Sequence, residues 1–271
     1  MMAAFFHHLA YDFKNGLRDR SQLLMNYLFP LGLVVMFGAL MGNVNPAFLD
    51  TMIPAMISIA IMSSTLLGMP TPIVTAREAG VYRSFKINGV PAASIIAIPV
   101  ISNTLHMIVV SVIISLVSSL LFHAALPTHW GSFILISLVT IFAMSGLGTL
   151  IGVIAANTRA TVLLSQIFFV PSMILSGMMV PASMLPEGLL RVGLLLPATS
   201  AMNAWRVLAY GLPADFSALW SVLVLLIGGI LAFVLSVILF RWDNNNQQRG
   251  RSPLLAGIAI LPYILAAIFL G

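Results

Sequence analysis

The 271-residue sequence contains no cysteine and very little charge. Without cysteine there is no disulfide, no thiolate nucleophile and no cysteine-ligated metal site. Charged residues make up only 7% of the chain, against about 25% in a typical soluble domain, whereas 60% are hydrophobic and the mean hydropathy is +1.08. So few charges cannot cover the surface of a water-soluble protein. The sequence therefore predicts an all-α, polytopic membrane protein, because its apolar runs are far longer than transmembrane strands.

Motifs for catalysis and for nucleotide binding are also lacking. The only lysines are Lys14 and Lys86, and neither follows a glycine, so the sequence has no phosphate-binding loop. No His-Glu-x-x-His pattern occurs, and no catalytic residue, metal site or bound cofactor is expected. The net charge of +5 comes from basic residues at the ends of apolar runs. That arrangement is a topology signal and does not indicate a nucleic-acid partner.

Long apolar runs predict a domain of six membrane spans over residues 21–242. The six are expected at about 23–41, 52–74, 94–122, 132–155, 161–180 and 216–240. Region 243–271 adds a polar loop and an apolar run, 253–270, that is just long enough for a seventh span. No Lys, Arg, Asp or Glu occurs between residues 87 and 158, and the basic residues flanking this interval should be cytoplasmic, so it contains an even number of crossings.

Basic residues also set the expected orientation. With these spans, ten of the twelve Lys and Arg residues lie on one side, and the two exceptions are Arg191 and Arg206. Because basic loops stay in the cytoplasm, the N-terminus is predicted inside and the C-terminus outside. Residues 1–20 should form an interfacial amphipathic helix, because apolar side chains recur there at helical spacing while polar side chains, Asp12 among them, take the side that faces the head groups. The alternative for these residues is an unstructured cytoplasmic tail.

Segment 181–215, between the fifth and sixth spans, has two halves of about four turns each. Such short halves do not cross a membrane, so they are predicted to form an outer re-entrant pair around Pro197. The candidate residues of an outer gate in this pair are Pro181, Glu187, Arg191, Pro197 and Arg206.

Three polar side chains are predicted at membrane depth. Asn103 and His106 fall in the third span, and Gln166 falls in the fifth. Polar and ionisable groups within a membrane are functional candidates, so these three are candidate groups of a transport pathway. The alternative is a neutral hydrogen bond to a neighbouring helix, and it is the favoured interpretation of His106.

The segment 75–91 is a short basic stretch between long apolar spans. It holds four of the few charges in the chain, which are Arg77, Glu78, Arg83 and Lys86. Its positive charge places it on the cytoplasmic side. We interpret it as the element that receives force from a cytoplasmic partner, and the alternative is a loop whose charges only set topology.

Two stretches together resemble the ATP-binding-cassette export permeases of the second type. The first resembles the segment that follows the second span of that family, and it comprises Glu78-Ala-Gly80, Tyr82-Arg83 and Asn88-Gly-Val-Pro91. The second resembles the re-entrant region before the last conserved span, and it comprises Ser176-Gly-Met-Met-Val-Pro181, Leu185-Pro186 and Leu196-Pro-Ala-Thr-Ser200. The resemblance covers residues 1 to about 242, and the apolar run at 253–270 departs from the six-span pattern.

The resemblance implies a membrane-spanning subunit of an ATP-driven exporter in a bacterial or archaeal cytoplasmic membrane. Two permease copies, a homodimer or a heterodimer, would pair with two ATPase subunits that bind ATP and Mg²⁺. The segment after the second span would sit in a groove of the ATPase and drive alternating access. The coupling candidates carried over to this sequence are Glu78, Gly80, Val81, Tyr82, Arg83 and Lys86. The lack of buried charge favours a hydrophobic or amphipathic cargo, such as a drug, lipid or peptide, and the alternative is a large hydrophilic polysaccharide or a small ion. Membrane lipid would surround the spans.

Two other classes of function fit the sequence less well. An ion-gradient-driven secondary transporter would need carboxylates or a charged relay within its spans, and all seven Asp and Glu residues lie outside the predicted span interiors. An intramembrane enzyme would need a nucleophile beside a base, and none of the many serines sits in a recognisable catalytic arrangement.

Overall fold

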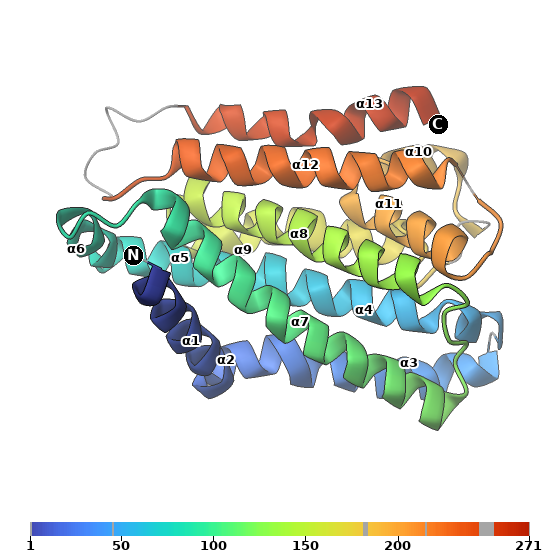
Figure 1. Cartoon of the computed structure of the whole chain (residues 1–271). Helices are drawn as coiled ribbons and strands as arrows, with labels where there is room; N and C mark the ends of the chain where they lie inside the picture. The colour runs from blue at the N-terminus through green and yellow to red at the C-terminus, as the bar shows by residue number, and fades with distance from the viewer. Residues whose placement is uncertain (1, 45, 181–183, 215, 244–251, 271) are drawn as a thin grey trace.

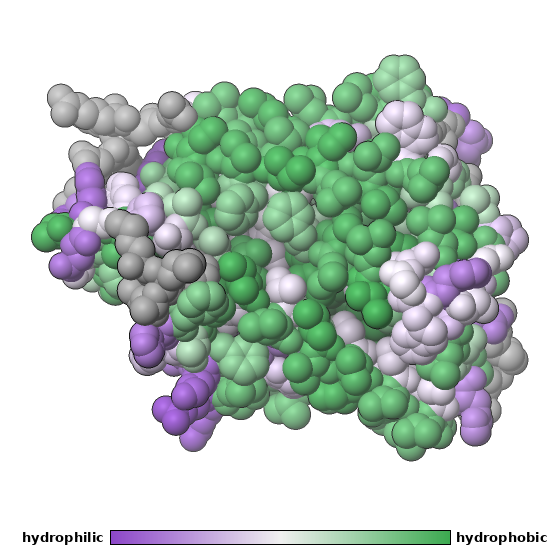
Figure 2. All heavy atoms as spheres, viewed as in Figure 1, coloured by the Kyte–Doolittle hydropathy of each residue, from purple (hydrophilic) through white to green (hydrophobic). Residues whose placement is uncertain are grey.

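The computed structural model describes residues 2–44, 46–180, 184–214, 216–243 and 252–270. Those residues form helices and connecting turns without any β-strand. Figure 1 shows a bundle of roughly parallel helices, with the N-terminus and α6 at one end and α10 at the other. Six helices are long and apolar enough to cross a membrane, which confirms the predicted all-α fold with six spans. Figure 2 shows the matching surface, an apolar band between two hydrophilic ends.

The first two spans are helices interrupted by a π-helical segment. The first comprises α2 (Arg20–Leu23), the π segment η1 (Leu24–Leu28) and α3 (Phe29–Val44), and the second comprises α4 (Met52–Met62), the π segment η3 (Ser63–Gly68) and α5 (Pro70–Glu78). The two π segments contact each other, and Ser63 Oγ lies 2.9 Å from the carbonyl oxygens of Met25 and Ala60. The Ser63 hydroxyl therefore donates to carbonyl groups of both spans where the π segments interrupt the regular backbone hydrogen bonds of the α-helices.

The other four spans are single helices. They are α7 (Ala92–Phe122), α8 (Trp130–Ile154), α9 (Thr158–Leu175) and α12 (Ala218–Leu239). The fifth span was expected to continue to residue 180, and that boundary is wrong. The helix ends at Leu175 because Gly177 adopts a left-handed φ of 77°, a conformation that glycine takes without strain and that stops the helix.

Two spans form the buried centre of the bundle. They are Met52–Glu78 and α8, and the other spans surround them. Gly148 of α8 lies so close to the second span that a Cβ atom there would be only 2.0 Å from the carbonyl oxygen of Thr65. One turn later, a Cβ atom on Gly152 would lie 3.0 Å from the carbonyl oxygen of Pro70. The Gly-x-x-x-Gly pattern therefore serves packing within the chain.

The C-terminal segment lies along α12. It starts as a 3₁₀ helix, η7 (Pro253–Ile260), continues as α13 (Leu261–Leu270), and ends near the α10 end of the bundle (Figure 1). Tyr263 fills the notch at Gly228, where a Cβ atom would lie 2.4 Å from the phenol oxygen. Because a 3₁₀ helix rises about 2.0 Å per residue and an α-helix about 1.5 Å, this segment reaches roughly 30 Å, close to the hydrocarbon thickness. The seventh crossing itself stays a prediction.

Short helices close the two ends of the bundle. At one end, α1 (Met2–Arg18) packs on α7, and α6 (Val81–Ile87) joins α5 to α7. At the other end lie α10 (Glu187–Gly193), α11 (Pro197–Ala204) and a third π segment, η5 (Trp205–Ala209). Almost all of α11 is buried, and it contacts α4, α8, α9 and α12. This helix is therefore inserted between spans, whereas α10 stays exposed.

We expect Gly148→Ala to destabilise the protein. Its added methyl group overlaps a backbone carbonyl, which cannot move away as a side-chain end can, so the two central spans must separate. Overpacking of this kind costs about 1–3 kcal/mol. The measurement is the melting temperature of the purified protein in one detergent. Gly131→Ala in the same helix is the control, because its added methyl group meets open space, and an equal melting temperature for both variants would contradict the packing described.

Candidate functional site

The predicted coupling segment 75–91 comprises the end of α5 and the short helix α6, which lies between two glycine turns. Gly80 adopts a φ of 73° between α5 and α6, and Gly89 adopts a φ of 72° before Pro91, the N-cap of α7. Both conformations lie in the left-handed region that favours glycine. The turns place α6 at the tip of the bundle, away from the apolar band (Figures 1 and 2).

Arg77 anchors this segment to α8. Its side chain is only 3% exposed, and its guanidinium donates to the carbonyl oxygens of Val153 at 2.8 Å, of Gly152 at 3.4 Å, and of Ala155. The last carbonyl groups of a helix have no partner within the helix and carry the negative end of its dipole. The arginine counted as a topology charge in the sequence thus caps a central span.

Tyr82 and Arg83 connect α6 to the end of α12. Tyr82 is 7% exposed, and its ring lies 5.1 Å from that of Phe240, with the pKa of its hydroxyl raised to about 12 by burial. Its side chain therefore points into the chain. The family resemblance implied that Tyr82 contacts the ATPase, but this buried side chain is not available to a partner's pocket. Arg83 forms an ion pair with Asp243, just beyond α12. The segment is thus joined to both α8 and α12.

The outer side of this region combines apolar and charged side chains. We define the α6 surface as the exposed residues Glu78, Val81, Arg83, Lys86 and Ile87. Ile87 is 80% exposed, the second most exposed large hydrophobic side chain among the described residues. The sequence-based candidates do not include Ile87, although an apolar residue between Lys86 and Asn88 in a polar turn indicates a side chain exposed to a partner. An exposed apolar side chain ringed by charges is typical of a protein-binding surface.

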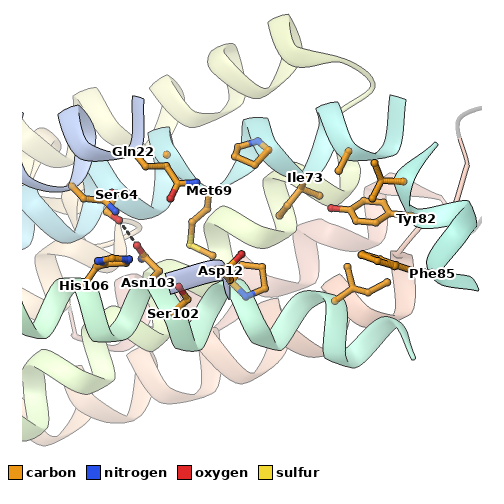
Figure 3. Close-up of a pocket in the computed structure, with 17 residues that line it drawn as sticks. Asp12, Gln22, Ser64, Met69, Ile73, Tyr82, Phe85, Ser102, Asn103 and His106 are labelled. Atoms are coloured by element: carbon orange, nitrogen blue, oxygen red, sulfur yellow. Dashed lines mark hydrogen bonds between the residues drawn. The ribbon is translucent and has the colours of Figure 1, made fainter. Parts of the chain in front are cut away.

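A cavity of about 210 Å³ begins beside α6 and extends into the bundle. Its walls come from α1, η1, the second span, α6 and α7 (Figure 3). Near α6 it is lined by Ile73, Tyr82 and Phe85, and at the far end by Ser64, Asn103 and His106. The cavity therefore connects the coupling segment with two of the three polar groups predicted at membrane depth.

Asn103 and His106 are buried but only partly hydrogen-bonded. Ser64 Oγ donates to Asn103 Oδ1 at 2.5 Å, and Tyr27 of η1 shares a 2.8 Å hydrogen bond with His106 Nδ1. The favoured interpretation of His106, a hydrogen bond to a neighbouring helix, is the arrangement observed. Its ring also stacks on Phe13 of α1 at 4.2 Å. Asn103 Nδ2 and His106 Nε2, however, have no hydrogen-bond partner among the described residues.

Gln166 and the outer candidates lie elsewhere. Gln166 is exposed on α9 and does not line the cavity. Glu187 and Arg191 form an exposed ion pair of 2.9 Å within α10. Pro197 is the buried first residue of α11, whereas Arg206 lines a second cavity of about 360 Å³ between α9, α10 and η5. Arg206 and Leu190 of α10 line this cavity together, and Pro181 lies outside the described residues.

Comparison with known proteins supplies the family. The sequence model of the ABC-2 type transporter family matches residues 3–210, which is well over half of the chain. The chain belongs to the ABC-2 type transporter family. Neither curated proteins nor solved structures give a match. The protein is therefore a multi-pass membrane subunit, the permease of an ABC transporter, and this family membership implies an ATP-binding-cassette subunit as its partner.

The family match covers the coupling segment and the cavity of this ABC-2 permease. It ends at Tyr210, before α12 and the C-terminal segment. Within the described residues, no three His, Asp or Glu side chains are grouped so as to hold a metal ion. The features available for function are thus the α6 surface, the internal cavity and the helices that join them.

We expect Arg77→Gln to destabilise the permease much more than Arg83→Gln. Glutamine is too short to reach the three carbonyl groups at the end of α8, and hydrogen bonds from a charged donor contribute about 1.5–3 kcal/mol. Arg83 forms a largely exposed ion pair, which contributes about 0–1 kcal/mol. Melting temperatures of the two variants in the same lipid nanodiscs test this difference. An Arg77→Gln protein as stable as the wild type would refute the anchoring role.

Proposed function

We propose that this ABC-2 permease is the membrane-spanning subunit of an ATP-driven exporter. Its α6 end would face the cytoplasm of a bacterial or archaeal cell, with the C-terminus outside. ATP and Mg²⁺ would bind to two copies of a partner ATPase, and the permease itself would bind no cofactor. The observation that carries the proposal is the α6 surface, an exposed apolar and charged tip tied by Arg77 and Arg83 to two spans.

Force applied to α6 has a direct route into the spans. A displacement of α6 would pull on α8 through the Arg77 cap and on α12 through Tyr82 and Arg83. The second span leads from the same segment to η3, which packs against η1. π segments are places where a helix can change register, so η1 and η3 are suited to open and close the cavity between them. Alternating access would follow from this movement.

The internal cavity suits an amphipathic cargo. Its described lining combines apolar side chains from α5, α6 and α7 with amide and hydroxyl groups deeper in the bundle. An apolar wall gives binding energy by burial, and a few polar groups fix orientation. A drug, lipid or peptide with both kinds of surface would be accepted there.

The proposal includes a second copy of the chain. Gln166 lies near the middle of α9 with its side chain exposed, and an amide facing hydrocarbon leaves its hydrogen-bonding groups unsatisfied. The first span and α9 also bury the smallest share of their residues, and both contact η3. A second copy packed on this face would cover both helices and offer Gln166 a polar partner. A homodimer is the simplest such assembly.

Substitutions on the α6 surface should weaken ATPase binding. We expect Ile87→Ala, Glu78→Ala and Arg83→Ala each to lower affinity for the cognate ATPase, because they remove an anchor or charges of a docking surface. Interface hot spots contribute about 1–4 kcal/mol, and about 1.4 kcal/mol is a tenfold change in affinity. The measurement is the dissociation constant for the ATPase with the permease in nanodiscs.

Met184→Ala is the matched control for this experiment, since Met184 is an equally exposed apolar residue near α10. Its affinity for the ATPase should equal that of the wild type. Tyr82→Ala is less informative, because the loss of its buried ring would also reduce stability. If all three α6-surface variants bind the ATPase and support transport as the wild type does, α6 is not the coupling element.

Cross-linking through Gln166 tests the dimer. The chain has no cysteine, so Gln166→Cys introduces a single thiol. We expect oxidation in membranes to give a disulfide-linked dimer, because the face that carries Gln166 meets its equivalent in the second copy. Val109→Cys, on an exposed face near the middle of α7, should remain monomeric. Cross-linking of both variants to the same extent, or of neither, would argue against this dimer face.

A further inference from the structure

The cavity beside α6 contains a single charged group among its described lining residues. That group is Asp12 of α1, and no Lys or Arg lines the cavity. The sequence pattern placed Asp12 on the polar face of an interfacial helix, but α1 packs on α7 and turns this residue toward the space between them (Figure 3). Asp12 belongs to neither of the two ion pairs of the described residues. No Lys or Arg among the described lining residues compensates this carboxylate, and the one basic group in that lining is the imidazole of His106.

Hydrogen-bonding groups line the cavity beyond Asp12. Gln22, Asn26 and Ser102 contribute amide and hydroxyl oxygen atoms that accept hydrogen bonds. Asn103 Nδ2 lacks a partner among the described residues, and Asn103 is more than nine-tenths buried, at 7% exposure. Buried polar atoms are normally hydrogen-bonded, so atoms without a partner beside a cavity indicate a ligand or water that completes them.

Apolar side chains form the rest of the wall. Met69 and Ile73 of the second span and Ile95 of α7 face the same space as Asp12. Tyr82 and Phe85 of α6 line the end of the cavity nearest the tip of the bundle. A small volume with one charge and a ring of polar atoms fits a head group better than a whole large molecule. The adjoining apolar side chains then suit the chain or ring system attached to that head group.

We propose that this cavity binds the cationic head group of an amphipathic ligand. An ammonium group would lie beside the Asp12 carboxylate and donate to the neighbouring oxygen atoms, and an oxygen atom next to the ammonium group would accept from Asn103. An anionic head group would face the carboxylate, and no Lys or Arg among the described lining residues offsets the repulsion; the one histidine there, His106, already has Tyr27 as a hydrogen-bond partner. The inference rests on the proposed exporter function, since it specifies the class of cargo.

The test uses two photoactivatable probes with the same alkyl chain and a diazirine near the head group. One ends in a primary ammonium group with an adjacent ether oxygen, and the other ends in a carboxylate. Each is irradiated with the full-length permease alone in zwitterionic nanodiscs, and labelled peptides are quantified by mass spectrometry. Labelling of the lipid-exposed face of α12 measures how much of each probe has entered the membrane.

We expect the ammonium probe to label cavity-lining peptides of α5 and α7, and the carboxylate probe to label them at background. Asp12→Asn should reduce the ammonium labelling by about five-fold, the factor that corresponds to loss of a partly exposed charge pair. Asp12→Glu should restore it, which separates a charge effect from misfolding. Asp19→Asn is the control, because Asp19 is exposed outside the cavity and asparagine keeps its cap on Ser21 and Gln22.

Equal labelling by the two probes, or unchanged ammonium labelling in Asp12→Asn, would overturn the proposal. Because the assay contains no ATPase, its result does not depend on export. ATP-driven export measured in parallel distinguishes the two ideas: an active exporter without charge-selective labelling disproves only the head-group site. Charge-selective labelling in a protein that exports nothing would support the head-group site and disprove the exporter function.

Discussion

The guanidinium of Arg77, buried against the last carbonyl groups of α8, fixes the geometry on which the α6 end of this permease depends. It satisfies helix-end carbonyls that would otherwise be unpaired, and it holds the second span and the fourth span together where they leave the apolar band. With α8 held there, the Gly80 turn carries α6 out to the tip, where Tyr82 and Arg83 reach the end of α12. One charged side chain thus sets the position of a whole surface.

The same end of the bundle contains an opening into the membrane region. The cavity exists because the π segments η1 and η3 interrupt two spans at the depth of Asn103 and His106, while α1 covers the space from the side. Polar atoms that would be costly against hydrocarbon are gathered there around a small volume. The α6 surface and the cavity share Val81, and the buried Tyr82 lies next to it in the cavity wall, so a partner bound to α6 would contact the cavity's entrance.

The two ends of the bundle are built differently. At the α6 end, short elements are tied to the spans by side chains from distant parts of the sequence. At the α10 end, the buried helix α11 lies between spans, whereas α10 packs on α9 and carries an exposed Glu187–Arg191 ion pair. Because α11 is buried between spans, it moves only together with them. A rearrangement of the spans at the α6 end would therefore displace α11 at the opposite end through α4, α8 and α12.

The sequence by itself determined the six spans, because membrane crossing depends on local runs of apolar residues, and it located the coupling segment, because charges are rare. It did not determine where those charges point. Arg77 resembled a topology charge, Tyr82 a docking residue and Asp12 a headgroup-facing side chain, yet all three face the interior of the fold. Their partners are carbonyl groups of α8, a ring beyond α12 and a cavity beside α7. Only the tertiary structure brings such segments together, because burial depends on contacts that local periodicity does not encode.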